Sequence, residues 1–319
     1  MHKYLLRRLL VIIPTLLGIS LVLFSILALA PGDPFEELAL NPNIPAEVRM
    51  NLRHQFGLDD PLPIRYLRWL TAMLHGDWGY SFVSRVNVQD LILQRLPTTL
   101  FVLGTAYVLA LLIALPAGII SAVKPYSLFD QVATTLAFIG FSLPTFFTGL
   151  LFILLFSLHL DWLPFIYSTT IEVSGIAWVG EHLRQAAMPI AVLGLFEAAS
   201  LTRFVRASML DVIHQDFVTT ARAKGLTERH TILVHVLRNA LIPVVTIMAL
   251  QLPGIFTGAV ITEQIFRVPG IGSLLITSIQ STDTPVVMAI TFVYAILVVA
   301  FNLIADIVYG CLDPRIAYG

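Results

Sequence analysis

The sequence predicts an all-α integral membrane protein with six transmembrane helices, and two observations lead to this prediction. Only 12% of the 319 residues are charged, whereas ordinary soluble domains carry about 25%. The charged residues are also clustered, and most of the segments between the clusters reach the roughly 20 residues that a helix needs to cross the membrane. Five segments are free of charge, at 9–32, 96–123, 131–160, 239–262 and 284–305, and a sixth, 185–202, is interrupted only by Glu197. So many long uncharged segments argue against a soluble fold.

The first of these segments has two interpretations. Its basic start and the small residues at 28 and 30 fit a secretory signal with a cleavage site. However, the apolar run is longer than the roughly 7–15 residues of a signal's apolar core, and Pro31 directly follows the candidate cleavage site. We therefore predict an uncleaved transmembrane helix within residues 1–30.

Lysine and arginine predict the orientation, because cytoplasmic loops carry more of them than the loops opposite. Six spans place both termini on one side. On that side lie Lys3, Arg7, Arg8, Lys124, the six basic residues between 203 and 238, and Arg315. The short loops opposite carry only Arg184 and Arg267, and the long 31–97 segment, although it holds six arginines, is weak evidence for orientation. We therefore predict that both termini and residues 203–238 are cytoplasmic.

Residues 31–97 are predicted to form a small helical segment outside the cytoplasm. Apolar positions four apart predict a helix over 46–56. A second helix is expected after Asp60, which is a good N-cap residue with Pro61 in the first turn behind it, and it should end at Gly76. The segment is either a cap on the outer membrane surface or a docking surface for a ligand-carrying partner.

Residues 209–224 predict one amphipathic helix that is too polar to span the membrane. Its apolar positions recur every four residues, at Met209, Ile213, Phe217 and Ala221. Gly225 is expected to end it because glycine adopts a positive φ without steric cost, and Thr227 is expected to cap a helix that returns to the membrane. The amphipathic helix either lies on anionic lipid or is held in the groove of a partner protein.

The stretch Thr-Ala-Arg-Ala-Lys-Gly-Leu at 220–226, with Arg-Asn-Ala at 238–240 and Pro243 behind it, resembles the cytoplasmic "EAA" coupling loop of ABC-importer permeases. The form is that of the dipeptide/oligopeptide/nickel permease family. Matching motifs extend along the whole chain: Tyr4 with Arg7-Arg8, Pro31-Gly32-Asp33-Pro34, Gly57-Leu58-Asp59 with Pro61, Tyr66, Trp69-Leu70, Gly76-Asp77, Gly79, Ser81, Ser208-Met209-Leu210-Asp211, His235, Glu263, Ile265-Phe266, Pro269-Gly270, Gly272 and Leu312-Asp313-Pro314-Arg315. Two positions depart from the pattern, namely Thr220 in place of an acidic residue and Arg267-Val268 in place of an aromatic.

The resemblance implies a type I ABC-importer permease in the bacterial plasma (inner) membrane. It divides the chain into a cytoplasmic N-terminus with the first transmembrane helix (1–30), an extracytoplasmic helical segment (31–97), a permease core (98–310) with a coupling loop at 207–237, and a cytoplasmic C-terminus (311–319). Implied partners are the lipid bilayer, a second homologous permease subunit, two ATP-binding cassette subunits and an extracytoplasmic substrate-binding protein. The cargo would be di- or oligopeptides, with nickel chelates, glutathione or oligosaccharides as alternatives.

In such a transporter, closure of the ATPase subunits moves the coupling helix. The residues expected to couple this chain to the ATPase are Asp216, Ala221, Arg222, Ala223, Lys224 and Gly225. The small residues allow close approach and the turn, whereas Arg222 and Lys224 reach acidic or carbonyl groups on the partner. Asp216 is expected to pair with one of these two cations.

Polar or helix-breaking residues inside spans are candidates for a substrate pathway, because lipid disfavours both. The candidates are Glu197, Ser142, Pro144, Gln251 and Glu263. Glu197 has two interpretations, which are an ion pair with Arg203 or Arg206 and a cavity-facing acid that meets a cationic group of the cargo. A rival hypothesis is an ion-driven secondary carrier that titrates Glu197, Glu263 or Asp306, but no repeat of related topology is detectable.

Motifs for other chemistry are missing from the sequence. There is no G-x-x-x-x-G-K-[ST] phosphate loop, so the chain is expected to bind no cofactor itself, with ATP and Mg held by the partner ATPase subunits. No catalytic motif, metal site or nucleic-acid-binding pattern is found; His230 and His235, for example, are five residues apart, which does not place them on one helix face. The chain is therefore expected to be no enzyme by itself.

Overall fold

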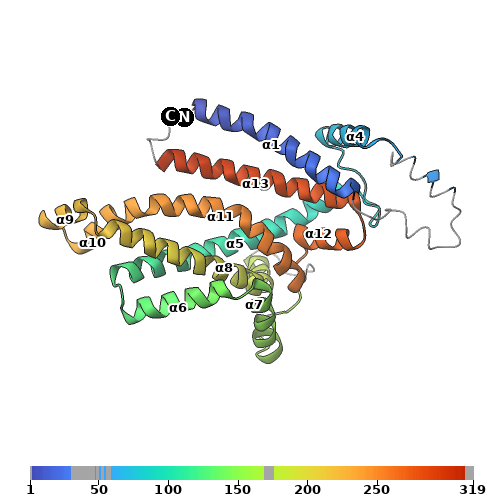
Figure 1. Ribbon diagram of the computed structural model, residues 1–319. Coiled ribbons are helices and arrows are strands. Elements are labelled where there is room, and N and C mark those ends of the chain that lie inside the picture. The colour runs from blue at the N-terminus through green and yellow to red at the C-terminus, as the bar shows by residue number, and fades with distance from the viewer. Residues whose placement is uncertain are drawn as a thin grey trace.

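The computed structural model describes residues 2–29, 47, 50–51, 54, 59–168 and 176–312, with side chains omitted at a few of these positions. The regular elements of this part are helices, and one isolated antiparallel bridge joins Tyr80 and Asn87. In chain order the helices are α1 (His2–Leu29), α4 (Leu62–Leu74), α5 (Val88–Val123), α6 (Leu128–Ser142), α7 (Thr145–Phe152), the π-helix η1 (Ile153–His159), α8 (Ile176–Ile213), α9 (Asp216–Ala223), α10 (Glu228–His230), the π-helix η2 (Thr231–Val236), α11 (Leu237–Ile265), α12 (Ile271–Gln280) and α13 (Thr284–Leu312). The predicted all-α fold is confirmed (Figure 1).

Five helical segments of the described chain are long and apolar enough to cross a membrane, in α1, α5, α8, α10–α11 and α13. Helix α6 and the α7–η1 helix form a sixth span if this pair, which is bent by 103°, is counted as one. The bend lies at Leu143, which is extended (φ −85°, ψ 127°) because the following Pro144 disfavours the helical conformation before it. Pro144 therefore sets the place of the bend.

Helices α5 and α8 form the centre of the bundle and pack along each other. Residues spaced four apart on α5 are small and buried, at Ala106, Ala110, Ala114 and Gly118. A Cβ atom on Gly118 would lie 2.6 Å from Cβ of Val205 on α8. Small side chains let the two backbones approach closely, which is how helices associate in membranes.

The bundle has two distinct ends (Figure 1). Helices α9 and α10 lie at one end, which we call the α9 end, and α4 and α12 lie at the other, which we call the α12 end. Helix α1 starts, and α13 finishes, on the side of the α9 end, as expected for an even number of crossings. Helix α4 contacts α1 through Tyr66 and Phe24 (ring centroids 5.5 Å apart) and α13 through Trp69 and Phe292 (5.9 Å).

Two details of the predicted helices were wrong, and one lies mostly outside the described residues. The last is the predicted helix over 46–56, most of which lies outside the described residues; positions 47, 50–51 and 54 are described and are helical. Helix α4 begins one residue late, with Pro61 at its N-cap, because the Asp60 carboxylate pairs with the Arg68 guanidinium instead of capping the helix.

The predicted continuous helix over 209–224 is broken at residues 214–215. Helix α8 ends at Ile213, Gln215 is extended (ψ 151°), and α9 begins at Asp216. The break turns α9 so that Val218 is buried, whereas Phe217, which was expected on the apolar face, is 37% exposed. The apolar spacing of four residues continues across this short turn, so the spacing could not reveal the break.

Candidate functional site

The candidate site is the turn between α9 and α10. Gly225 adopts φ +80° and its N–H donates to the Arg222 carbonyl at 3.0 Å. Nothing lies within 4 Å of the place where a Cβ would stand, so glycine is required here by its backbone conformation alone. Thr227 Oγ1 accepts from the His230 N–H at 3.4 Å, as predicted for a cap. The predicted glycine turn and capped second helix are therefore confirmed.

A buried apolar cluster, which we call the α9 core, anchors this turn to three spans. It joins the inner faces of α5, α8, α9, η2 and α11, and its buried members are Ala122, Val205, Met209, Val212, Val218, Ile232, Val236, Ala240 and Val244. Ala221 is also buried, at 7% exposure. Displacing α9 must therefore displace the ends of α5, α8 and α11, since close-packed interiors transmit strain.

The outward side of the turn is polar and solvent-exposed. Every residue from 222 to 230 is exposed, including Arg222, Ala223, Lys224 and Gly225. Arg222 donates from Nη2 to Glu228 Oε1 at 2.6 Å and from Nε to Oε2 at 3.0 Å. This hydrogen bonding raises the pKa of the Arg222 guanidinium above its usual value.

Two expectations about this site need correction. Arg222 pairs with Glu228 across the glycine turn and not with Asp216, whose main-chain oxygen accepts from the Thr220 hydroxyl. Ala221, expected among the small residues at a partner surface, is buried within the chain. Its small size therefore serves packing within the chain.

Neither predicted arginine partner of Glu197 is available to it. Arg206 binds Asp130, and Arg203 stacks on Phe138 and Phe141 at 5.3 and 4.4 Å. Spacings of six and nine residues place the two arginines on other faces of α8 from Glu197, because neighbours on one helix face are three or four apart.

Glu197 lies on α8 and faces Tyr107 of α5. It is half-buried and close enough to the Tyr107 phenol for an electrostatic interaction. Tyr107 donates to the Met248 carbonyl at 2.9 Å, and Gln251 Nε2 approaches Ser200 Oγ at 3.3 Å. We call Tyr107, Glu197, Ser200 and Gln251 the mid-bundle patch. It contains two of the five candidate pathway residues.

Glu263 is enclosed at the α12 end. Its carboxylate, with the whole residue 1% exposed, accepts from Thr99 Oγ1 at 2.6 Å and from the Ser273 N–H at 2.9 Å. The carboxylate thus occupies the N-terminus of α12, where free N–H groups favour an anion. A Cβ on Gly270 would overlap this carboxylate, which explains the glycine at that place. Ser142 and Pro144 lie at the α6–α7 bend.

Comparison with known proteins identifies the family. The family model described as "Binding-protein-dependent transport system inner membrane component" matches residues 114–318. The chain belongs to this family. A model of the N-terminal part of such membrane components matches residues 1–103. The resemblance drawn from the motifs is therefore confirmed, and the chain is the permease subunit of an ABC importer.

Relatives of this permease match it over its full length. The oligopeptide transport system permease protein AppB of Bacillus subtilis is 43% identical over 320 residues and the match covers 100% of both chains. The dipeptide transport system permease protein DppB of Escherichia coli (strain K12) is 36% identical over 337 residues, covering 100% of this permease and 99% of DppB. The glutathione transport system permease protein GsiC of Salmonella paratyphi A is 38% identical over 318 residues, covering 100% of both.

A solved structure supports the fold of the permease. The crystal structure of an amino acid ABC transporter with histidines aligns with a TM-score of 0.53 and 14% identity. The alignment covers 69% of this permease and 94% of that chain. At this identity the likeness supports the shared arrangement of helices and nothing finer.

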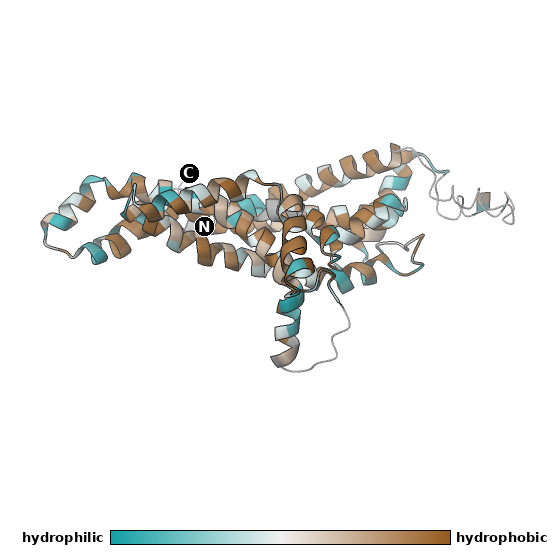
Figure 2. Cartoon of the chain, turned by 90° about the horizontal axis from the view of Figure 1, so that it is seen from below, coloured by the Kyte–Doolittle hydropathy of each residue, from teal (hydrophilic) through white to brown (hydrophobic). Residues whose placement is uncertain are grey.

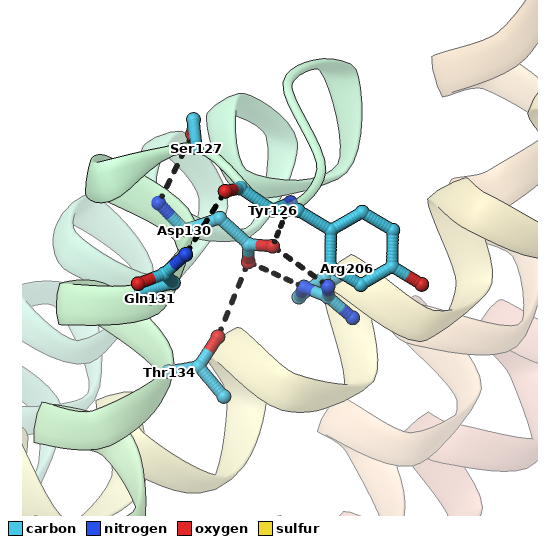
Figure 3. A network of polar contacts seen from close by, with 6 residues as sticks. All are labelled: Tyr126, Ser127, Asp130, Gln131, Thr134 and Arg206. Carbon is cyan, nitrogen blue, oxygen red and sulfur yellow. Dashed lines mark hydrogen bonds and ion pairs between the residues drawn. The ribbon is translucent and has the colours of Figure 1, made fainter.

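The structure places an ion pair between α6 and α8 that was not predicted from the sequence (Figure 3). Asp130 and Arg206 form it, and Tyr126, Ser127, Gln131 and Thr134 complete a network of polar contacts. Two signals could have found it. Asp130 stands three residues after Ser127, the spacing of a capping box, and Arg206 is a charge within a long apolar helix.

A second missed group lies at the α12 end of the permease. Asp283, which is 2% exposed, accepts from Ser81 Oγ at 2.5 Å and from the Phe82 N–H at 3.1 Å. It thereby fastens the loop before α5 to the start of α13. No local pattern could reveal this pair, because its residues are separated by 202 positions.

Proposed function

We propose that this permease imports di- or oligopeptides and that the α9–α10 turn couples it to ATP hydrolysis. One observation carries the coupling role. Residues 222–230 form a continuous exposed run that begins at the end of α9, and the opposite face of α9 is buried in the α9 core. Figure 2 shows hydrophilic residues at this end, beyond the largely hydrophobic bundle. A partner that grips the run would move three spans together.

The proposed assembly contains a second homologous permease, two ATP-binding cassette subunits and an extracytoplasmic binding protein. ATP and Mg are bound by the cassette subunits. The α9 end and both termini face the cytoplasm, in agreement with the excess of lysine and arginine on that side. The α12 end, with α4 beside it, then faces the binding protein.

The peptide cargo is supported by the relatives and by the mid-bundle patch. AppB and DppB are named as oligopeptide and dipeptide permeases. Glu197 offers a carboxylate, without a bound arginine, that a peptide's amino terminus can meet. The named glutathione permease GsiC keeps glutathione, itself a small peptide, among the cargoes to test.

The coupling role is tested by Gly225→Asp. Aspartate at φ +80° strains the turn and adds a negative charge beside Glu228 on the exposed run. We expect membrane insertion to remain and ATP-driven peptide uptake into proteoliposomes to be abolished. The matched control is Gly76→Asp, at φ +86° and also with nothing within 4 Å, but at the opposite end. Normal uptake by Gly225→Asp would refute the coupling role.

The cargo role of Glu197 is tested by Glu197→Gln. We expect uptake of peptides with a free amino terminus to fall more than uptake of the same peptides after N-acetylation, because only the former carry the cation that the carboxylate meets. Ser200→Ala, in the same patch without a charge change, is the control. Equal losses for both kinds of peptide would remove Glu197 from the cargo path.

A further inference from the structure

The Asp130–Arg206 ion pair joins two spans with fixed geometry (Figure 3). Arg206 Nε lies 2.6 Å from Asp130 Oδ1, and Arg206 Nη2 lies 2.8 Å from Asp130 Oδ2. The Asp130 side chain is 4% exposed and that of Arg206 is 25% exposed. A bidentate contact of this kind fixes orientation as well as distance.

The Asp130 carboxylate is held in place from its own side as well. It accepts from the Tyr126 N–H at 2.8 Å and from Thr134 Oγ1 at 3.2 Å, while Ser127 Oγ accepts from the Asp130 N–H at 3.3 Å. These bonds tie the α5–α6 turn and the first turns of α6 into one unit. Arg206 therefore grips a rigid part of α6 and not a flexible side chain.

The pair stands close to the α9 core but adds a helix that the core lacks. Arg206 shares α8 with Val205, Met209 and Val212, which are members of that core. It precedes the end of α8 at Ile213 by seven positions, or about 10 Å of helix. Within the described chain, α6 contributes no residue to the α9 core. Arg203 of α8 stacks on Phe138 and Phe141 of α6, and the Asp130–Arg206 pair adds a bidentate ion pair between the same two helices.

We propose that Asp130 and Arg206 are positioning residues that carry the displacement of α9 into α6, and from there to the 103° bend before α7. The inference rests on the proposed function, in which an ATPase moves α9. Without the pair, α6 keeps its ring contacts with α8, namely Arg203 on Phe138 and Phe141 and the stacked rings of Phe141 and Phe196, which allow helices to slide more readily than a bidentate ion pair does. ATP hydrolysis would then continue while its mechanical output reaches fewer spans.

The experiment compares Asp130→Asn with wild type in the assembled transporter in proteoliposomes, measuring peptide uptake and ATP hydrolysis together. Because coupling free energies correspond to about 5–150-fold changes, we expect peptide transported per ATP to fall about tenfold while hydrolysis stays within about twofold. Asp306→Asn is the matched control, since it breaks the 2.9 Å pair of Arg8 with Asp306 between α1 and α13, outside the α9 core. The amount of peptide that Asp306→Asn transports per ATP should equal that of wild type. An unchanged ratio in Asp130→Asn would overturn the inference.

Distances between spin labels separate this inference from the proposed function. In a Cys311→Ser background, one label pair is placed by Leu128→Cys and Phe217→Cys, on α6 and α9, and another by Leu74→Cys and Phe217→Cys, between the two ends. Leu128 and Leu74 are 78% and 75% exposed. With Asp130 present, ATP and Mg should change the distance between the labels at 74 and 217 and leave the distance between the labels at 128 and 217 unchanged. In Asp130→Asn, ATP and Mg should change the 128–217 distance as well.

Each other outcome has a distinct meaning. If 74–217 does not respond to ATP in any background, the proposed function fails and the inference fails with it. If 74–217 responds, but 128–217 behaves alike with and without Asp130, only the inference fails.

Discussion

The enclosed acids of the α12 end and the ion pair of the α9–α10 turn are held in opposite ways. At the α12 end Glu263 and Asp283 are 1% and 2% exposed, and each accepts hydrogen bonds from other elements. At the α9 end Arg222 and Glu228 pair in solvent, with side chains 42% and 57% exposed. Breaking a buried polar contact leaves unsatisfied groups, whereas an exposed ion pair is exchanged at little cost. The α12 end is therefore held in one arrangement, while the α9 end is free to exchange its pair for contacts with a partner.

The largest effect is expected from Glu263→Ala at the α12 end. The change leaves Thr99 and the Ser273 N–H without their acceptor in a buried site, and we expect the free energy of unfolding to fall by about 3 kcal/mol. A denaturant titration of the purified permease in mixed micelles measures it.

The control for this change is Glu181→Ala. Glu181 is also a paired carboxylate, but its side chain is 31% exposed and lies 3.7 Å from Arg184 in an i, i+3 contact. Glu181→Ala should lower the free energy of unfolding by less than about 1 kcal/mol. Comparable losses of unfolding free energy in Glu263→Ala and Glu181→Ala would show that burial of Glu263 does not stabilise the α12 end.

A smaller effect on stability is expected from Arg222→Gln at the α9 end. Because the pair with Glu228 is exposed, the free energy of unfolding should change by less than about 1 kcal/mol. Peptide uptake should nevertheless fall, since the guanidinium belongs to the run that we propose the ATPase grips. Stability and uptake are measured on the same preparation.

The control is Arg229→Gln, which removes another exposed cation of the run, seven positions further along the chain, and leaves the Arg222–Glu228 pair intact. We expect it to retain more uptake than Arg222→Gln. A large loss of stability in Arg222→Gln would instead mean that the α9 end is as rigid as the α12 end.

The spans and the glycine turn could be predicted because their causes are local. An apolar run of sufficient length must form a helix in lipid, and a glycine between two helical patterns marks a turn whatever surrounds it. The break between Ile213 and Asp216 escaped prediction, since apolar spacing continues through it and only packing of Val218 in the α9 core selects it.

The same difference between local and long-range causes applies to the partners of the charged residues. Sequence spacing suggested Arg203 or Arg206 for Glu197 and a nearby cation for Asp216, and the structure gives different partners to the arginines in both cases. Arg206 binds Asp130, which is 76 positions away, and Ser81 binds Asp283 across 202 positions. Such pairs depend on which helices are neighbours.

By itself the sequence determined that this chain crosses the membrane about six times, that a polar helical turn interrupts it near residue 225, and that its motifs are those of an importer permease. Only the tertiary structure decided which acids are enclosed, which are exposed and which arginine holds α6 to α8. The physical reason is that hydrophobic length and backbone conformation act within a few turns of chain, whereas hydrogen bonds and ion pairs in a bundle form between whichever helices pack together.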